Sequence, residues 1–237
     1  MLIYARGVKM TPPRDSELSP DLQKEVAKAN PKRLHRWFDE LEREGRVVLR
    51  TSFLRTAVYA LGAWVFVIFI TAGFIVLPVS TWNPFAGDRG ISGWMQAGMG
   101  LLFVAGLILF GFGALLWTFV FPVVRPRMIV SRWGIESIGS KPGGVFTLFA
   151  VAWADVVQVG GEFTPTRWPF PPVLQVMLTA RADGVRRARW VRSRAQGSTV
   201  VHGVNGMLRG RRRDVLAFLV HAHAAVRDAA ESDDDRG

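Results

Sequence analysis

Two long uncharged apolar runs in the first half of the chain constrain its fold more than any other feature. They cover residues 56–79 and 98–121. A helix needs about 20 apolar residues to cross a bilayer, and both runs are longer than that. Neither run has the polar stripe that a core helix of a soluble protein usually keeps. The sequence therefore predicts a membrane protein with a two-helix transmembrane hairpin over residues 56–124.

Charge at the flanks of the two runs predicts how the hairpin is oriented. Lys and Arg accumulate on the cytoplasmic side of membrane helices, and the loop between the runs carries only Asp88 and Arg89. The other flanks are rich in arginine, at Arg43, Arg46, Arg50, Arg55, Arg125, Arg127 and Arg132. We therefore expect a multi-pass protein of the cell inner (plasma) membrane with both termini in the cytoplasm. Aromatic residues fit interfacial belts, with Trp82 and Trp94 outside and Tyr59 and Trp117 inside.

Composition narrows the chemistry and the partners. The 237 residues include no cysteine, which excludes disulfides, cysteine-ligated zinc, iron–sulfur clusters and thiol nucleophiles. A formal net charge of +11 is also found in nucleic-acid-binding proteins. In a membrane protein, the same excess follows from cytoplasmic Lys and Arg residues and from their attraction to anionic lipids. We therefore expect the lipid bilayer as a partner and no nucleic acid.

The cytoplasmic segment before the hairpin, residues 1–55, is predicted to be disordered over residues 1–15 and to hold two short helices. Translation starts either at Met1 or at Met10. A capping residue followed by proline predicts helices over residues 20–29 and 31–44, the second closed by Gly45. The second helix has an apolar face, formed by Leu34, Trp37, Phe38 and Leu41. That face packs on the C-terminal domain or a second subunit, or it lies in the head-group plane of the membrane.

After the hairpin, the sequence changes to short apolar runs separated by Gly, Pro, Asp and Ser, which is typical of an antiparallel β domain. Seven strands are predicted, over residues 127–130, 134–138, 145–153, 156–159, 173–179, 188–191 and 199–204. A helix with one apolar face follows over residues 212–230, and residues 231–237 are expected to form a disordered acidic tail. Residues 125–230 are thus predicted to fold without the hairpin.

Seven antiparallel strands followed by one amphipathic helix are the layout of a pleckstrin-homology-like (PH-like) barrel. In the stretches RMIVSRWGIESIG and FTLFAVAWADVVQV, the chain resembles bacterial membrane proteins in which a two-helix hairpin precedes a PH-like domain. The resemblance covers residues 98–230. It implies an α+β membrane protein with a cytoplasmic seven-stranded PH-like β-barrel capped by the C-terminal helix. An OB-like or SH3-like barrel is the alternative. The turn at residues 131–134 has one charge, so phosphoinositide binding does not follow from the resemblance.

Motifs of catalysis are scarce in this sequence. His221 and His223 are two residues apart on a predicted helix and so point to different faces, and His202 is expected to be a satisfied edge-strand residue. The segment 139–144 lacks the ending of a phosphate loop and is expected to form a β-turn. We therefore expect no enzyme activity, no metal and no cofactor. The apolar runs also lack the ionisable residues that transporters usually need. An oligomeric channel or a transporter accessory subunit is the alternative function.

One cluster of arginines remains as a candidate binding surface. Its members are Arg186, Arg192, Arg194, Arg211, Arg212 and Arg213. The cluster is either a solvated face, a contact for anionic lipid head groups, or a contact for a protein or nucleic-acid partner. Trp168 and Phe170 lie either in a stiff solvent loop or in contact with lipid or a partner. These features predict a PH-like binding or scaffolding domain at the inner membrane surface, with a homo-oligomer or an unidentified membrane protein as the protein partner.

Overall fold

The computed structural model describes residues 18–76, 91–166, 171–189, 191 and 193–234, and it divides the chain into two compact units. One unit is continuous, from Ser52 to Arg125. The other is assembled from the segments on either side of it, Met1–Thr51 and Pro126–Gly237. We call the first unit the apolar hairpin and the second the split domain. From the sequence, residues 1–55 are expected to be separate from a domain at residues 125–230. In the structure, residues 18–51 belong to that domain. Residues 1–15, predicted to be disordered, lie outside the described residues.

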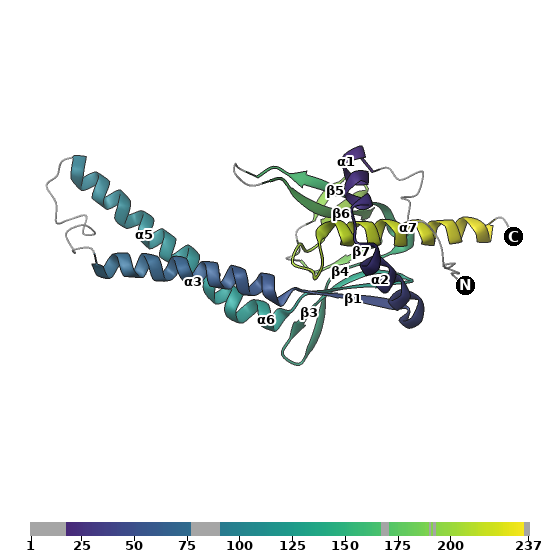
Figure 1. The fold of residues 1–237 in the computed structure, drawn as a ribbon, viewed down its shortest axis with the longest axis horizontal. Helices are drawn as coiled ribbons and strands as arrows, with labels where there is room; N and C mark the ends of the chain where they lie inside the picture. The colour runs from purple at the N-terminus through teal and green to yellow at the C-terminus, as the bar shows by residue number, and fades with distance from the viewer. Residues whose placement is uncertain (1–17, 77–90, 167–170, 190, 192, 235–237) are drawn as a thin grey trace. The chain divides into compact units, whose positions relative to one another are not determined.

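The apolar hairpin consists of two long helices. α3 covers Phe53–Val76, and α5 covers Ile91–Leu115 before a π-helical turn, η1 (Leu116–Val120), and the short α6 (Phe121–Val124) (Figure 1). Ring contacts join Tyr59 to Trp117 and Phe66 to Phe110, so the two helices run antiparallel. Both are long and apolar enough to cross a bilayer. In the most apolar 18-residue stretch of each helix, only 6% is buried, unlike the core helix of a soluble protein.

A five-stranded antiparallel sheet in the order β1-β2-β3-β4-β7 forms one layer of the split domain. Its strands are β1 (Arg46–Arg50), β2 (Arg127–Ser131), β3 (Gly134–Lys141), β4 (Gly144–Ala152) and β7 (Val185–Arg187). β1 precedes the hairpin and β2 follows it, yet the two strands pair along their whole length. Burial alternates along β1, where Val47 and Leu49 face the core, as expected for a sheet with one buried face.

A four-stranded antiparallel sheet in the order β5-β6-β9-β8 forms the second layer. Its strands are β5 (Val156–Thr164), β6 (Val173–Arg181), β9 (Thr199–Gly203) and β8 (Arg194–Gln196). A short 3₁₀ turn, η2 (Trp153–Asp155), connects the layers. Both sheets contribute to one hydrophobic core, for example through Val130 and Leu178. The closed seven-stranded barrel implied by the resemblance is therefore wrong, because the domain contains two separate antiparallel sheets.

The strand at residues 188–191 is where the sequence prediction failed. In its place, the chain forms two three-residue strands, β7 and β8, which belong to different sheets. Such short strands do not join the two layers into a barrel. β1 and β8 were not predicted, and β5 continues to Thr164, beyond the predicted strand end at residue 159. The other six predicted strands overlap β2 to β6 and β9. The turn predicted at residues 139–144 is confined to residues 142–143, because β3 continues to Lys141 and β4 begins at Gly144.

Three helices cover the sheets, namely α1 (Pro20–Ala27), α2 (Pro31–Glu44) and α7 (Arg212–Asp234). α7 packs on β5 and β6 and also contacts α1 and α2. The rings of Trp37 and Phe38 lie 5.4 and 5.0 Å from the ring of Phe218, which is fully buried. The apolar face of α2 therefore packs on the domain itself. α7 continues to Asp234, so residues 231–234 are helical rather than part of a disordered tail.

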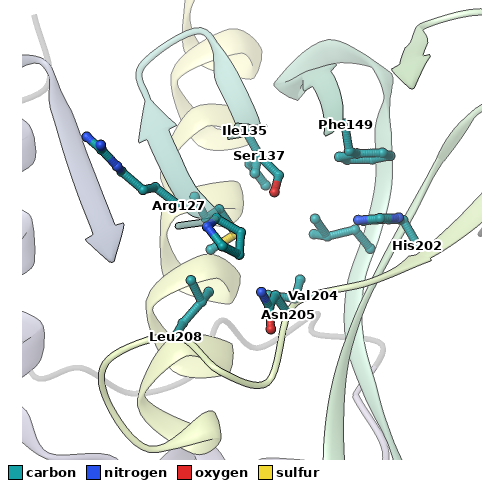
Figure 2. Close-up of a pocket in the computed structure, with 11 residues that line it drawn as sticks. Arg127, Ile135, Ser137, Phe149, His202, Val204, Asn205 and Leu208 are labelled. Carbon is teal, nitrogen blue, oxygen red and sulfur yellow. The ribbon is translucent and has the colours of Figure 1, made fainter. Parts of the chain in front are cut away.

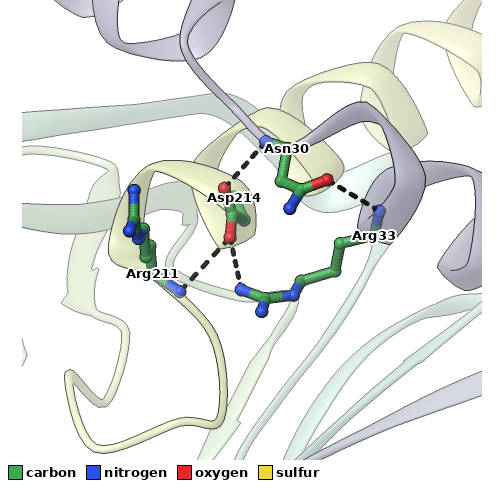
Figure 3. Close-up of polar contacts among 4 residues, drawn as sticks. All are labelled: Asn30, Arg33, Arg211 and Asp214. Carbon is green, nitrogen blue, oxygen red and sulfur yellow. Dashed lines mark hydrogen bonds and ion pairs between the residues drawn. The ribbon is translucent and has the colours of Figure 1, made fainter.

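A buried carboxylate ties the N-terminal helices to α7 (Figure 3). Asp214, in the first turn of α7, is 0% exposed. Its Oδ2 accepts a hydrogen bond from Arg33 Nη1 at 2.6 Å, and its Oδ1 accepts one from the backbone N–H of Asn30 at 3.0 Å. The backbone N–H of Arg211 makes a third, longer contact at 3.4 Å. Since a buried charge is tolerated only when it is paired and hydrogen-bonded, these contacts fix α2 in place.

Candidate functional site

The chain leaves the split domain after Thr51 and returns at Pro126, and these two points lie side by side. Thr51 Oγ1 donates a hydrogen bond to the carbonyl oxygen of Pro126. Arg50 and Arg127 are opposite each other in the β1–β2 ladder, where opposed Cα atoms are about 4.5–5.5 Å apart. We call this the exit end of the first sheet. The opposite end, where Arg46 pairs with Ser131, is the far end.

Basic residues are concentrated at the strand termini of the exit end. Because neighbouring strands are antiparallel, this end carries the last residues of β1, β3 and β7 and the first residues of β2 and β4. These are Arg50, Lys141, Arg187, Arg127 and Gly144. The far end carries Arg46, Gly134, Val185, Ser131 and Ala152. Four of five terminal residues are therefore basic at the exit end, against one of five at the far end.

Arg209 joins the exit end from the loop that precedes α7. Its backbone N–H donates to the carbonyl oxygen of Arg50 at 2.7 Å, and the preceding Leu208 forms a β-bridge with Thr51. We call the five residues Arg50, Arg127, Lys141, Arg187 and Arg209 the basic rim. Four of them are exposed and Arg127 is half-buried, so the rim is open to solvent.

The charge of the basic rim is not neutralised by any carboxylate within ion-pairing distance in the described part of the chain. The ion pairs there join Lys24 to Asp21, Lys28 to Glu25, Arg33 to Asp214 and Arg43 to Glu44. Glu136 is the one acidic residue within the five strands, and its carboxylate accepts a hydrogen bond from Thr147 Oγ1 at 2.8 Å. The rim is thus positive charge without an ion-pair partner, distributed from Arg187, opposite Phe149, to Lys141 at the end of the β3–β4 hairpin, and a polyanionic surface could neutralise it.

A small cavity lies between the two sheets next to the rim (Figure 2). Its polar lining residues are Arg127 of the basic rim, Ser137, His202 and Asn205, and the rest of the lining is apolar, formed by Pro126, Met128, Ile135, Phe149, Leu178, Val204 and Leu208. The cavity has about 320 Å³ of empty space when the part open to solvent is included. Its enclosed part admits about one water molecule. Small-molecule sites usually enclose about 300–1,000 Å³, so the cavity is too small to hold a substrate in this conformation.

His202 belongs to the wall of this cavity. It lies on β9, where the pairing with β8 ends at Val201, so at His202 the strand pairs with β6 alone, opposite Leu178. Its ring stacks on Phe149 with the centroids 3.9 Å apart, and its Nδ1 lies 3.4 Å from Ser193 Oγ. Burial, with a smaller contribution from the positive charge of Arg187, lowers the pKa of His202 from 6.5 to about 4. The imidazole is therefore neutral near pH 7 and behaves as a packing group.

The two histidines of α7 are also packing residues. Burial lowers the pKa of His221, whose side chain points into the domain. Burial also lowers the pKa of His223, although a hydrogen bond between its ring and the carbonyl oxygen of Val156 raises it in part. Neutral imidazoles held in this way contribute to the fold rather than to a surface site.

Part of the arginine cluster predicted from the sequence lies on two different sheets. Arg186 is exposed on β7, next to Arg187 of the basic rim. Arg194 is exposed at the start of β8, in the second sheet. Three further residues of the predicted surface, Arg192, Trp168 and Phe170, lie outside the described residues.

The arginines before and at the start of α7 have different environments from one another. Arg211 is exposed, whereas Arg212 and Arg213 are half-buried. Arg212 Nη1 donates to the carbonyl oxygen of Leu174 at 2.8 Å, and so helps to hold α7 on the second sheet. Arg213 buries its Nε atom. The described members of the predicted cluster are therefore divided among two sheets, α7 and the residue before it, and they differ in exposure.

The five residues of the basic rim are far apart in the sequence, so grouping basic residues by their proximity along the chain could not reveal the rim. In the sequence, Arg50 and Arg127 stand out only as positive flanks of the apolar runs. Lys141, Arg187 and Arg209 join them through strand pairing and one backbone hydrogen bond. Comparisons of the chain with family models, curated proteins and solved structures gave no match.

Proposed function

We propose that this chain is an integral protein of the inner membrane whose apolar hairpin crosses the bilayer. Its split domain then lies in the cytoplasm at the membrane surface and serves as a binding and assembly platform without catalysis of its own. The observation that carries this proposal is the insertion of the hairpin between two paired strands, β1 and β2. Such an insertion anchors one folded domain to the hairpin at two adjacent points.

Both connections between the domain and the hairpin are short. α3 begins at Phe53, three residues after Arg50, and α6 ends at Val124, three residues before Arg127. An extended residue spans at most about 3.6 Å, so each connection reaches about 10 Å. A domain held by two connections of this length stays at the surface of the bilayer. This arrangement suits a platform for lipids or other membrane proteins.

The order of the strands supports a PH-like fold for the split domain. Without the two three-residue strands β7 and β8, seven strands remain, with β1 to β4 in one sheet and β5, β6 and β9 in the other. The C-terminal helix α7 then packs on β5 and β6. Seven antiparallel strands followed by one helix are the PH-like layout. In this proposal, the hairpin is inserted into the first β–β connection instead of preceding the domain.

Topology reporters test this proposal. We expect a reporter fused after Gly237 to be active only in the cytoplasm and a reporter inserted near Gly87 to be active only outside, because the arginines flank the domain-proximal ends of the hairpin. A C-terminal reporter that is active outside would overturn the orientation. Recovery of the full chain in the soluble fraction of lysed cells would overturn the membrane hairpin itself.

A further inference from the structure

We infer that the basic rim binds the anionic phospholipid head groups of the leaflet next to which the domain is anchored. This inference rests on the proposed function and names its partner. The rim combines five basic side chains from four strand ends and one loop, at the end of the sheet where the chain leaves and re-enters the domain. Of the arginine cluster predicted from the sequence, Arg186 lies next to this rim, beside Arg187 on β7.

The covalent connections place two residues of the rim, Arg50 and Arg127, within reach of the leaflet. Arg50 and Arg127 are each three residues from a helix of the apolar hairpin, a distance of about 10 Å at most. The Debye length is about 8–10 Å at physiological ionic strength. Cations this close to an anionic surface are attracted to it, whereas cations at the far end are screened by salt. The leaflet is therefore the first polyanion that the rim meets.

The rim side chains are free to make this contact. Arg50, Lys141, Arg187 and Arg209 are exposed, and in the described residues they have no hydrogen bond or ion pair from their side chains. Arg127 makes only a long contact, at 3.4 Å, from Nη2 to Ser140 Oγ. Each basic residue near an anionic leaflet contributes about a fivefold increase in the ratio of bound to released domain.

A single fluorescent label can report this contact in the full chain, because the protein contains no cysteine. Val145 is 62% exposed in β4, next to the turn that follows Lys141, and Trp133 is 86% exposed between β2 and β3 at the far end. We would replace each in turn with cysteine, attach the label, and reconstitute the chain in nanodiscs that carry lipid-borne quenchers. One set of discs contains phosphatidylcholine only, and the other contains one third phosphatidylglycerol.

We expect the Val145→Cys label to be quenched in the phosphatidylglycerol discs and released as salt rises. The Trp133→Cys label should be quenched equally little in both discs. In the Val145→Cys background, Lys141→Ser with Arg209→Ser should reduce the bound-to-released ratio about 25-fold. The matched pair Arg46→Ser with Arg181→Ser removes two exposed arginines near the far end and should leave the ratio unchanged.

Equal quenching of the Val145→Cys label in the two kinds of disc would overturn the lipid assignment, and so would equal effects of the two double variants. A short DNA duplex that binds the protein equally well in both discs would also overturn it, and would assign the rim to nucleic acid. These outcomes concern the rim alone, since the chain is already inserted in the disc. Failure of the chain to enter nanodiscs would instead contradict the proposed function.

Discussion

The apolar hairpin and the split domain are held together by different kinds of contact. The hairpin is one continuous segment, and its described contacts join α3 to the segment that begins at α5, such as Phe66 with Phe110 and Trp64 with Thr118. The split domain is made of two segments separated by residues 52–125. Its core needs both segments, because Trp37 and Phe38 pack on Phe218 and Asp214 pairs with Arg33.

This difference teaches which perturbations each region should respond to. If the apolar hairpin crosses the bilayer as proposed, its stability depends on apolar length and helix packing and should respond little to pH. The split domain contains a buried, ion-paired carboxylate, so its stability should depend on that charge pair. Burial also lowers the pKa values of His202, His221 and His223, so its stability should depend on pH. It also depends on the N-terminal segment being present. The predictions below test this contrast, from the largest expected effect to the smallest.

The largest effect should come from separating the two segments of the domain. A fragment of residues 125–237 lacks β1, α1 and α2, and so exposes the apolar surfaces that Val47, Leu49 and Trp37 cover. We expect this fragment to aggregate and to show no cooperative urea unfolding. A chain in which about four flexible residues replace residues 52–125 should fold as a soluble domain, since Thr51 and Pro126 lie side by side.

Circular dichroism, solubility and urea unfolding of the two products measure this contrast. The linker length is matched to the β1–β2 pairing, in which Arg50 is opposite Arg127. A control product with the same linker but without residues 1–45 retains β1 and removes only α1 and α2. Equal cooperative unfolding of the 125–237 fragment and the linked domain would show that the N-terminal segment is not part of the core.

This split explains how much of the molecule the sequence could predict. α2 was predicted to its last residue because its signals are local. Asn30 accepts a hydrogen bond from the backbone N–H of Arg33, Pro31 follows, and Gly45 ends the helix with a φ of 70°. β1 was missed because five residues between a helix and an apolar run have no local strand signature. Its partner lies beyond the hairpin, where Arg46 pairs with Ser131.

The candidate site was missed for the same physical reason. Strand termini become neighbours only when the register of the whole sheet is known, and a shift of one residue changes which side chains share an edge. The sequence grouped arginines that are close along the chain. The structure groups Arg50, Lys141 and Arg187, which are far apart along the chain and share one end of a sheet.

The next largest effect should come from the buried carboxylate of the split domain. Asp214→Ala removes the acceptor for Arg33 and for the Asn30 backbone N–H. We expect the free energy of unfolding of the domain to fall by about 3 kcal/mol, as is usual when a buried, hydrogen-bonded ion pair is broken. Asp183→Ala is the matched control, because Asp183 is exposed and, among the described residues, its side chain accepts a hydrogen bond only from the adjacent Gly184 backbone N–H. Urea unfolding of the full chain in detergent measures both, and equal losses would contradict the role of Asp214.

A pH effect of similar size or smaller should also be confined to the split domain. Above pH 6.5, His202 is neutral in both the folded and the unfolded chain. Between pH 6.5 and about 4, the unfolded chain binds a proton that the folded chain does not, because burial lowers the pKa of His202 to about 4. The free energy of unfolding should therefore fall by up to about 3 kcal/mol over this window and then level off.

The variant His202→Phe tests the source of this pH dependence. A phenyl ring keeps the stacking on Phe149 but cannot take up a proton. We expect a shallower fall in stability between pH 6.5 and 4, with the remainder coming from His221 and His223, whose pKa values burial also lowers. The exposed residue His35 serves as the control through His35→Gln. A slope in His202→Phe equal to that of the parent chain would show that His202 does not carry the effect.

The smallest effect should come from the one interhelical hydrogen bond between side chains in the described part of the apolar hairpin. Trp64 Nε1 donates to Thr118 Oγ1 at 3.0 Å across the two helices. Hydrogen bonds of this kind between membrane helices contribute about 0.6 kcal/mol on average, because the separated helices also find partners for these groups. Trp64→Phe and Thr118→Val should each cost the hairpin no more than about 1 kcal/mol. The double variant should cost less than the sum, since the second change removes no further bond.

Helix content followed during denaturation in mixed micelles measures the stability of the hairpin, and urea unfolding of the domain in the same samples should remain unchanged. A loss of domain stability in these variants would mean that the two units are energetically coupled, and that the contrast between them does not hold.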